Sequence, residues 1–318
     1  MPGKYDTEVD PNNKNTSQAL IVELTGPDKR VLDVGTATGY VAKVLKERGC
    51  TVTGIELDPE AAQQAEKHCE RVIVGDVEKL DLEAEFGEEL FDVIIFGDVL
   101  EHLKEPELVL KRVKPFLSPG GYVVASIPNI AHGSVRLALL QGSFQYRPLG
   151  LLDETHLKFF TRESIEQLFD NAGYAIDILE RIRVGIFNTE IELDKGRVSE
   201  EVLEQISADP ESETYQFVLT AYPQSSPPLA AKLNRLRFLE ERLEQRDRVI
   251  YELSRKLRNM EELQRQLEDR NEQLARRERE VSELVQEVAK RNRRLANLEE
   301  RVKRLNQQVG KLRKKGRQ

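Results

Sequence analysis

Acidic side chains stand at the ends of four short apolar runs in the first third of the chain. Asp33 lies in RVLDV, Glu56 ends TVTGIE, Asp76 follows RVIVG, and Asp98 ends FDVIIFGD. Carboxylates can accept hydrogen bonds from the hydroxyl and amino groups of a ligand. They can act on one ligand only if the scaffold brings the ends of the four runs together.

A glycine-rich turn, VLDVGTATGY, follows the first run. Gly35 and Gly39 in this turn allow a ligand to approach the backbone closely, although a tight turn with nothing bound is the alternative. The dinucleotide fingerprint G-x-G-x-x-G fails at Ala37 and Tyr40, and no G-x-x-x-x-G-K-[ST] occurs. A nucleoside cofactor without phosphates fits better, and S-adenosylmethionine is such a cofactor. Glu56 could then accept hydrogen bonds from ribose hydroxyls.

Histidines are the candidate bases for removing a proton from an acceptor hydroxyl. His156 in GLLDETHLKFFT is the first candidate, His132 is the second, and His102 in GDVLEHL is assigned to holding its turn in shape. A structural hydrogen-bonding role is the alternative for each of them. His68 is assigned to the surface or to packing. The spacing of histidine and cysteine does not indicate a zinc site, so no metal is expected.

The irregular segment 129–160 supplies candidate acceptor-binding residues. Arg136, Tyr146 and Arg147 could bind an acidic or phosphorylated acceptor, and Asp153 would face the methyl group. The alternative is that the arginines are solvated or paired with Asp153 and Glu154. The side chains of Phe144, Phe159 and Phe160 are assigned to the core of a lid rather than to a stacking platform.

The elements that must position these residues alternate regularly. Strands are expected at 30–34, 51–56, 71–76, 91–98, 121–128, 174–184 and 214–222, and helices at 40–48, 59–69, 105–116 and 161–171. The strands are nearly continuous apolar runs, which is typical of a sheet covered on both faces. Residues 1–222 therefore predict a doubly wound α/β domain with a mostly parallel seven-stranded sheet, which binds ligands at the carboxyl ends of its strands.

Charge divides the chain near residue 228. Residues 1–228 carry 22 Lys and Arg against 40 Asp and Glu (net −18), and residues 229–318 carry 26 against 16 (net +10). PQSSPP at 223–228 has the composition of a linker. Beyond it, every seventh residue from Leu253 to Val309 is apolar, which predicts a coiled coil over 229–318 that forms a parallel dimer or trimer. The two cysteines, Cys50 and Cys69, indicate a reducing, cytoplasmic setting.

The domain resembles the class I S-adenosylmethionine-dependent methyltransferases, in the branch that includes the ubiquinone-biosynthesis O-methyltransferases. The motifs that carry the resemblance are, in order, VLDVGTATGY, GIELDP, VGDVE, FDVIIFGDVLEHLKEP and LSPGGYVVASIPN. The resemblance covers roughly residues 20–185. The chain departs from the family motif G-x-G-x-G at one position, because Ala37 stands in place of the middle glycine. The resemblance implies methyl transfer, an EC 2.1.1 type of reaction, with S-adenosylmethionine as cofactor.

By that resemblance, Asp33 would lie near the methionine amino group, Glu56 would bind the ribose, and Asp76 and Val77 would contact the adenine. The other family positions that touch the cofactor or line the floor beside it are Gly35, Thr36, Gly39, Leu57, Asp98, Val99 and His102. Residues 126–161 look like the acceptor-side segment of methyltransferase domains in bacterial polysaccharide and sugar-modifying systems. This second resemblance implies a sugar or glycan hydroxyl as acceptor.

Two other functions compete with this interpretation. The protein could be a coiled-coil scaffold or membrane-surface tether in which methyl transfer is secondary, because the basic end KLRKKGRQ could meet an anionic membrane or an acidic partner. These basic side chains could equally serve only to solvate the helix end. Nucleic-acid methylation is disfavoured, because the acidic domain would repel phosphates and GDVLEHL stands where a Pro-Pro-aromatic signature would be.

Overall fold

The computed structural model describes residues 9–11, 13–224 and 228–315. The chain forms two units, Met1–Phe238 and Leu239–Gln318, so the structural boundary lies beyond the predicted linker at 223–228. Residues 225–227 of that linker lie outside the described residues. The division of function between the two parts of the chain stays a prediction.

The first unit is built on one seven-stranded sheet, which confirms the predicted α/β fold. Its strands are β1 (Arg30–Val34), β2 (Thr51–Glu56), β3 (Arg71–Val74), β4 (Phe91–Gly97), β5 (Leu117–Pro128), β6 (Tyr174–Arg183) and β7 (Thr214–Pro223). The order is β3-β2-β1-β4-β5-β7-β6. Neighbouring strands are parallel from β3 to β5, and β7 runs antiparallel to both β5 and β6. The order reverses between β1 and β4, which is where open α/β sheets bind ligands.

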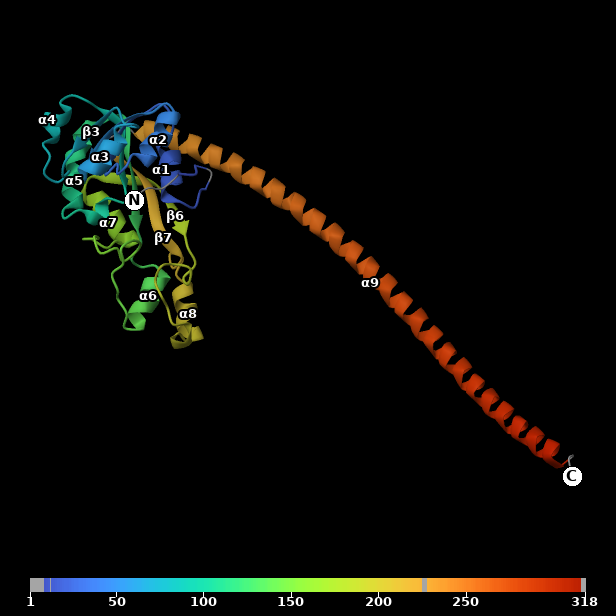
Figure 1. Cartoon of the computed structure of the whole chain (residues 1–318). Helices are drawn as coiled ribbons and strands as arrows, with labels where there is room; N and C mark the ends of the chain where they lie inside the picture. The colour runs from blue at the N-terminus through green and yellow to red at the C-terminus, as the bar shows by residue number, and fades with distance from the viewer. Residues whose placement is uncertain (1–8, 12, 225–227, 316–318) are drawn as a thin grey trace. The chain divides into compact units, whose positions relative to one another are not determined.

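Helices cover both faces of the sheet, as the apolar strands predict (Figure 1). One face packs against α1 (Ser17–Thr25), α2 (Tyr40–Glu47) and α3 (Pro59–Ala65), and the other against α4 (Leu82–Phe86), α5 (Pro106–Val113) and α7 (Arg162–Asn171). Short 3-10 turns are η1 (Leu100–His102), η2 (Lys114–Phe116) and η3 (Lys195–Arg197). The sequence did not predict α1, which begins at a capping bond from the Ala19 amide to the Thr16 hydroxyl.

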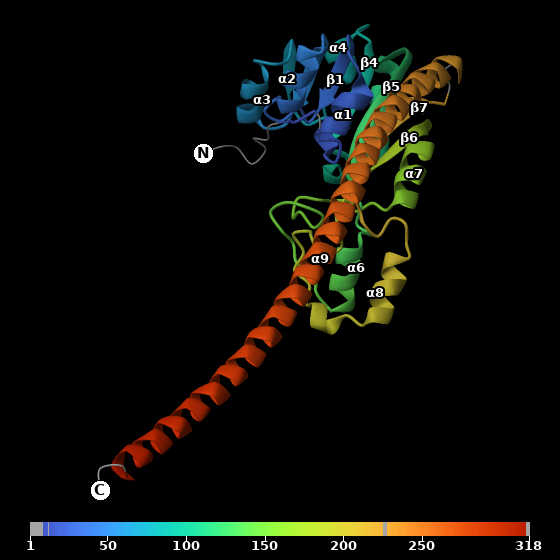
Figure 2. The same cartoon turned by 90° about the vertical axis from the view of Figure 1, so that its right-hand side faces the viewer.

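The two regions without predicted structure contain helices that pack together. Residues 129–160 contain α6 (Gly133–Leu140), and the acidic stretch at 189–213 contains α8 (Glu200–Ser207). Leu137 of α6 and Ile206 of α8 belong to one buried cluster, and Figures 1 and 2 both show the two helices side by side. We call residues 129–160 and 184–213 the cap. Leu151 and Leu152 of the first segment are likewise buried in one cluster with Ile191 of the second, so the two cap segments pack against each other.

Helix α9 (Pro228–Lys315) runs for 88 residues, and the second unit contains it from Leu239 onward. The helix confirms the predicted secondary structure there, whereas residues 316–318 lie outside the described residues. Leu274 and Val281, on the seven-residue repeat, are 57% and 58% exposed in the single chain, so their apolar surface is available to a partner. Among the described residues, no helix combines the length and apolarity needed to cross a membrane.

Candidate active site

A cavity of about 710 Å³ opens where β1, β2, β3 and β4 end. Ten of the residues singled out in the sequence line it: Gly35, Glu56, Leu57, Asp76, Val77, Asp98, Val99, His102, Asp153 and His156. The acidic ends of the four apolar runs therefore meet beside one cavity. Residues distant in sequence share the site, because the cap also lines the cavity. Its lining residues are Leu149, Gly150, Asp153, Thr155, His156 and Leu157.

The glycine turn after β1 is shaped by three left-handed residues. Gly35 has φ of 75°, and a Cβ atom there would lie 2.5 Å from Cγ2 of Val99, so no other residue fits without a shift. Gly39 has φ of 80°, and its Cβ would lie 2.9 Å from Cα of Ala65. Ala37 is left-handed as well, with φ of 49°, and its amide donates to Oε2 of Glu56 at 2.7 Å. That bond helps to offset the strain of a non-glycine residue.

Asp33 and Thr36 support the turn from behind rather than lining the cavity. Asp33 is 4% exposed, and its Oδ2 accepts a 2.8 Å hydrogen bond from the Thr36 hydroxyl. The pKa of Asp33 is raised to about 6, mainly by burial. The hydrogen bond from Thr36 lowers this pKa, and the negative charge of Glu56 raises it further. A cationic group in the neighbouring cavity would stabilise this buried carboxylate.

Glu56 and Asp76 are partly engaged with the protein. Glu56 accepts from the Ala37 amide and, through Oε1, from the Asp58 amide at 2.9 Å. Asp76 forms a 2.7 Å ion pair with Lys79, and this neighbour lowers the pKa of its carboxyl. Each carboxylate has about four lone-pair sites, so these contacts leave acceptor capacity at the cavity.

Asp98 directly follows β4 and has a left-handed conformation with φ of 57°. Its Oδ1 accepts a 2.6 Å bond from the Ser126 hydroxyl and another from the side-chain amide of Gln216. Burial raises the pKa of this carboxyl. Asp98 thus ties β4 to β5 and β7 at the cavity wall, a positioning task beyond the cofactor contact that was predicted.

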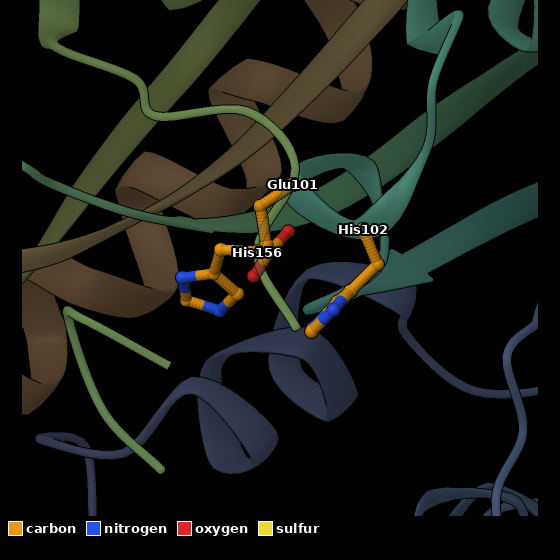
Figure 3. Close-up of side chains that lie close together, drawn as sticks. All are labelled: Glu101, His102 and His156. Carbon is orange, nitrogen blue, oxygen red and sulfur yellow. The ribbon is translucent and has the colours of Figure 1, made fainter. Parts of the chain in front are cut away.

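Glu101, His102 and His156 lie together at the cavity, and we call them the acid–imidazole cluster (Figure 3). The rings of His102 and His156 have centroids 4.8 Å apart and planes at 70°. Figure 3 shows the Glu101 carboxylate between the two rings. Glu101 is 1% exposed, and neither of its carboxylate oxygens has a hydrogen-bond partner among the described residues.

Backbone contacts hold this cluster together. The carbonyl oxygen of Glu101 accepts hydrogen bonds from the amides of Leu157 and Lys158, at 2.8 and 2.9 Å. Nδ1 of His102 lies 3.2 Å from the carbonyl oxygen of Thr155. The turn that carries GDVLEHL is therefore joined directly to GLLDETHLKFFT. Sequence reasoning missed Glu101, although its place beside His102 in that motif was the available signal.

His132 occupies a different position from the one that its predicted role requires. It is fully buried and is not among the residues that line the cavity. Its Nε2 lies 2.9 Å from the Val184 carbonyl, which assigns the proton to Nε2, and its Nδ1 accepts from the Ser134 amide at the start of α6. Burial lowers the pKa of this imidazole. His132 therefore joins two segments of the cap.

The predicted acceptor-binding arginines also lie away from the cavity lining. Arg136 pairs with Asp209 at 2.8 Å and Arg147 with Glu192 at 3.5 Å, rather than with Asp153 and Glu154, and Tyr146 is 58% exposed. Of the four residues predicted to bind the acceptor, Asp153 alone lines the cavity.

The phenylalanines of the cap differ in their surroundings. Phe160 is buried in the core of the sheet, whereas Phe159 is 37% exposed. Phe159 contacts the rings of Phe144 and His156 edge-on, with centroids at 6.3 and 6.2 Å. Phe160 therefore packs in the core of the sheet rather than in the predicted core of a lid, while Phe144 and Phe159 form an exposed aromatic rim.

Comparison with known proteins identifies a protein family whose members this chain resembles in sequence. A family profile described as "Methyltransferase domain" matches residues 12–178. A ubiquinone biosynthesis O-methyltransferase of Psychrobacter arcticus is 29% identical over 151 residues, which cover 46% of this chain and 59% of that protein. The corresponding protein of Chromobacterium violaceum is 29% identical over 155 residues, 48% of this chain and 66% of the relative.

Solved structures resemble the chain more distantly. A methyltransferase of Archaeoglobus fulgidus described as SAM-dependent shares 17% identity, with 67% of this chain and 94% of that chain covered and a TM-score of 0.48. The chain spans 59% of the length of the Psychrobacter arcticus relative. Because the family profile covers more than half of the sequence, including the Gly35 turn and the acid–imidazole cluster, the chain belongs to the methyltransferase-domain family.

Proposed function

We propose that this chain is an S-adenosylmethionine-dependent methyltransferase that methylates a hydroxyl group of a small molecule. One observation carries the proposal: a single cavity is lined both by the Gly35 turn with Glu56 and Asp76 and by the acid–imidazole cluster. The first set suits a nucleoside, and the second suits an acceptor proton. Membership of the methyltransferase-domain family supports both assignments.

The residues of the first set fit the cofactor. Gly35 allows Val99 to pack against the turn, because a Cβ on Gly35 would clash with Cγ2 of Val99, and both residues line the cavity. Glu56 can accept from ribose hydroxyls, and Asp76 with Val77 can contact the adenine. The buried charge of Asp33 favours a positively charged ligand nearby. When bound, the cofactor supplies a methyl group on a sulfonium, which is already activated for displacement.

The acceptor end must handle a proton. As the acceptor oxygen gains the methyl group it loses its hydrogen, while sulfur keeps the electron pair of the broken carbon–sulfur bond. Within the acid–imidazole cluster, His156 and His102 have the ring nitrogens that could take this proton. Thr155 orients His102 through its carbonyl oxygen. Glu101 is buried beside these two partly exposed rings, and its burial limits access of water on that side of the cluster.

The acceptor that we propose has an apolar or aromatic body beside its hydroxyl. Leu149 and Leu157 line the cavity and are 51% and 53% exposed, and the rim of Phe144 and Phe159 adjoins His156. The curated relatives named as O-methyltransferases support an oxygen acceptor. The sugar or glycan acceptor predicted from the sequence has no support from the comparisons.

Calorimetry with S-adenosylmethionine tests the cofactor assignment. The wild-type chain should bind it, and Glu56→Ala should weaken binding by about 10- to 100-fold, because two hydrogen bonds to a charged acceptor are lost. Glu60→Ala, an exposed change on α3, is the matched control and should bind like the wild type. Absence of wild-type binding, or equal binding by Glu56→Ala, would refute the assignment.

We further propose that α9 associates with α9 of a second copy as a parallel coiled coil. The supporting observation is the exposed apolar repeat on a helix of 88 residues. A cytoplasmic location, and contact of the basic C-terminal end with an anionic membrane or an acidic protein, are proposals that rest on composition.

A further inference from the structure

We infer that Glu101, His102 and His156 form a binding site for one divalent transition-metal ion. One ligand atom from each residue can be chosen so that all three atoms lie within 4.8 Å of one another. Two imidazoles and one carboxylate are a ligand set that binds zinc or iron in proteins and leaves positions open for water or substrate. The spacing of the sequence did not indicate this site, because it joins η1 to a distant loop of the cap.

The unpartnered carboxylate of Glu101 is the observation that points to a cation. Both oxygens are buried and lack hydrogen-bond partners among the described residues, although a buried unpaired carboxylate is costly. Asp98 and Asp153 stand nearby and add negative charge. The local surroundings thus concentrate negative charge where a cation would offset it.

The tautomer of His102 suits a ligand role. Nδ1 of His102 lies 3.2 Å from both the carbonyl oxygen and the hydroxyl oxygen of Thr155. The hydroxyl donates its hydrogen to Oδ1 of Asp153 at 2.6 Å and a carbonyl oxygen cannot donate, so the proton of His102 is on Nδ1. That assignment leaves the lone pair on Nε2. Metal-binding histidines are commonly oriented in this way, with the second ring nitrogen donating to a carbonyl or carboxylate. The carbonyl oxygen of Thr155 therefore already holds the His102 ring in an orientation that suits a metal ligand.

The required adjustment of the side chains is small. Ligand atoms of a tetrahedral zinc ion lie about 3.4 Å apart, given metal–ligand distances of about 2.1 Å. The atoms of the cluster lie within 4.8 Å, so torsional shifts of about 1.5 Å would complete the site. The backbone bonds from Leu157 and Lys158 to Glu101 already hold the two segments together.

The inferred ion would activate the acceptor hydroxyl. This role in methyl transfer rests on the proposed function, whereas binding of the ion does not. A hydroxyl bound at an open position loses its proton to water near neutral pH, because the cation lowers its pKa. The resulting oxyanion forms the new bond to carbon, and the electron pair of the broken bond stays on sulfur. His156 would then be a ligand rather than the base predicted from the sequence, and His102 would be a ligand rather than only a support for its turn.

The test is titration of the untagged, metal-stripped full chain with Zn²⁺ by calorimetry, supported by the visible absorption of a Co²⁺-loaded sample. The wild type should bind about one ion per chain at this site. Glu101→Gln and His156→Gln should each weaken binding by more than the roughly 10- to 100-fold that loss of an outer-shell partner causes. Bound Zn²⁺ should also raise the thermal midpoint of the wild type and not that of Glu101→Gln.

His68→Gln is the matched control, because it removes an imidazole near α3, away from the cluster. It should bind Zn²⁺ like the wild type. Absence of binding by the wild type, or unchanged binding in Glu101→Gln, would overturn the inference. Calorimetry of the same variants with S-adenosylmethionine separates the two proposals: retained cofactor binding without Zn²⁺ binding refutes the metal site alone, whereas Zn²⁺ binding without cofactor binding refutes the proposed function alone.

Discussion

The imidazole rings of His102 and His156 lie edge to face, with their centroids 4.8 Å apart. One ring comes from the turn after β4 and the other from the cap, so the contact depends on correct docking of the cap onto the sheet. The backbone of Glu101 secures that docking through the amides of Leu157 and Lys158. The acceptor side of the site is therefore assembled by tertiary structure rather than by one motif.

His156→Ala tests the acceptor side directly. We expect it to reduce methyl transfer by about 10²- to 10⁴-fold, whether His156 acts as a base or as a metal ligand. Binding of S-adenosylmethionine should remain within about threefold, because His156 belongs to the acceptor side. Single-turnover transfer to a hydroxyl acceptor found by screening provides the measurement. Activity within a few-fold of wild type would make His156 structural.

His132→Ala should show the opposite behaviour. It removes two hydrogen bonds and leaves a cavity in the cap, so we expect a loss of about 2–4 kcal/mol in the free energy of unfolding. The folded fraction should keep its methyl-transfer rate at low temperature, because His132 is not among the residues lining the cavity. Denaturant unfolding together with activity at 10 °C or so separates these effects. A large loss of activity in fully folded protein would restore His132 as a catalytic candidate.

The sequence was most informative where local pattern and burial agree. Strands β1 and β2 have the predicted bounds, because continuous apolar runs between turn residues leave few alternatives. Helices α6 and α8 were missed, since each is stabilised by the other segment of the cap and not by a strong pattern of its own. Glu101 was missed for a related reason. Its burial and its approach to His156 exist only after the cap has packed on η1.

Asp33→Asn should stabilise the protein while weakening cofactor binding. Folding raises the pKa of Asp33 from 3.8 to about 6, so between these values the folded state binds more protons than the unfolded state. Wild-type stability should therefore fall as pH rises through this window and be level above it. Asp33→Asn has no carboxyl to titrate and does not lose stability in this window. At pH 7 and without ligand, its free energy of unfolding should exceed that of the wild type by about 1–3 kcal/mol.

Denaturant unfolding between pH 4 and 8 or so measures this effect, with Asp170→Asn on the exposed part of α7 as the control. The control should keep the wild-type pH dependence. If Asp33→Asn is as pH-dependent as the wild type, then Asp33 does not hold a raised pKa in the folded state.

Gly35→Ala should disturb the turn in two separable ways. The new Cβ would meet Cγ2 of Val99 at 2.5 Å and would stand on a residue with φ of 75°. We expect a loss of about 2–4 kcal/mol in unfolding free energy and weak binding of S-adenosylmethionine. Adding Val99→Ala should remove the clash and leave the backbone strain of about 1–2 kcal/mol. A double mutant no more stable than the sum of the two single changes would argue against this contact.

Helix α9 offers two physical explanations for its stability, and they predict different assemblies. Ion pairs at i and i+4, such as Glu287–Arg291 at 3.0 Å and Glu300–Arg304 at 2.8 Å, could support an isolated helix. Exposed pairs of this kind contribute only about 0.3–0.5 kcal/mol each. The seven-residue apolar repeat has no function in an isolated helix, whereas a coiled coil would bury it. We therefore expect the full chain to be an oligomer.

Paired lysine substitutions distinguish the two explanations. Leu274→Lys with Val281→Lys places two charges on the apolar repeat, and we expect it to convert the oligomer to a monomer with less helix. Ala275→Lys with Ser282→Lys adds the same charge one residue away, on the side facing solvent in the coiled coil, and should leave the assembly intact. Sedimentation velocity gives the mass and circular dichroism gives the helix content. A monomeric wild type would show that α9 is a single helix stabilised by its ion pairs. Equal dissociation by both pairs would show that the oligomer does not depend on the apolar repeat.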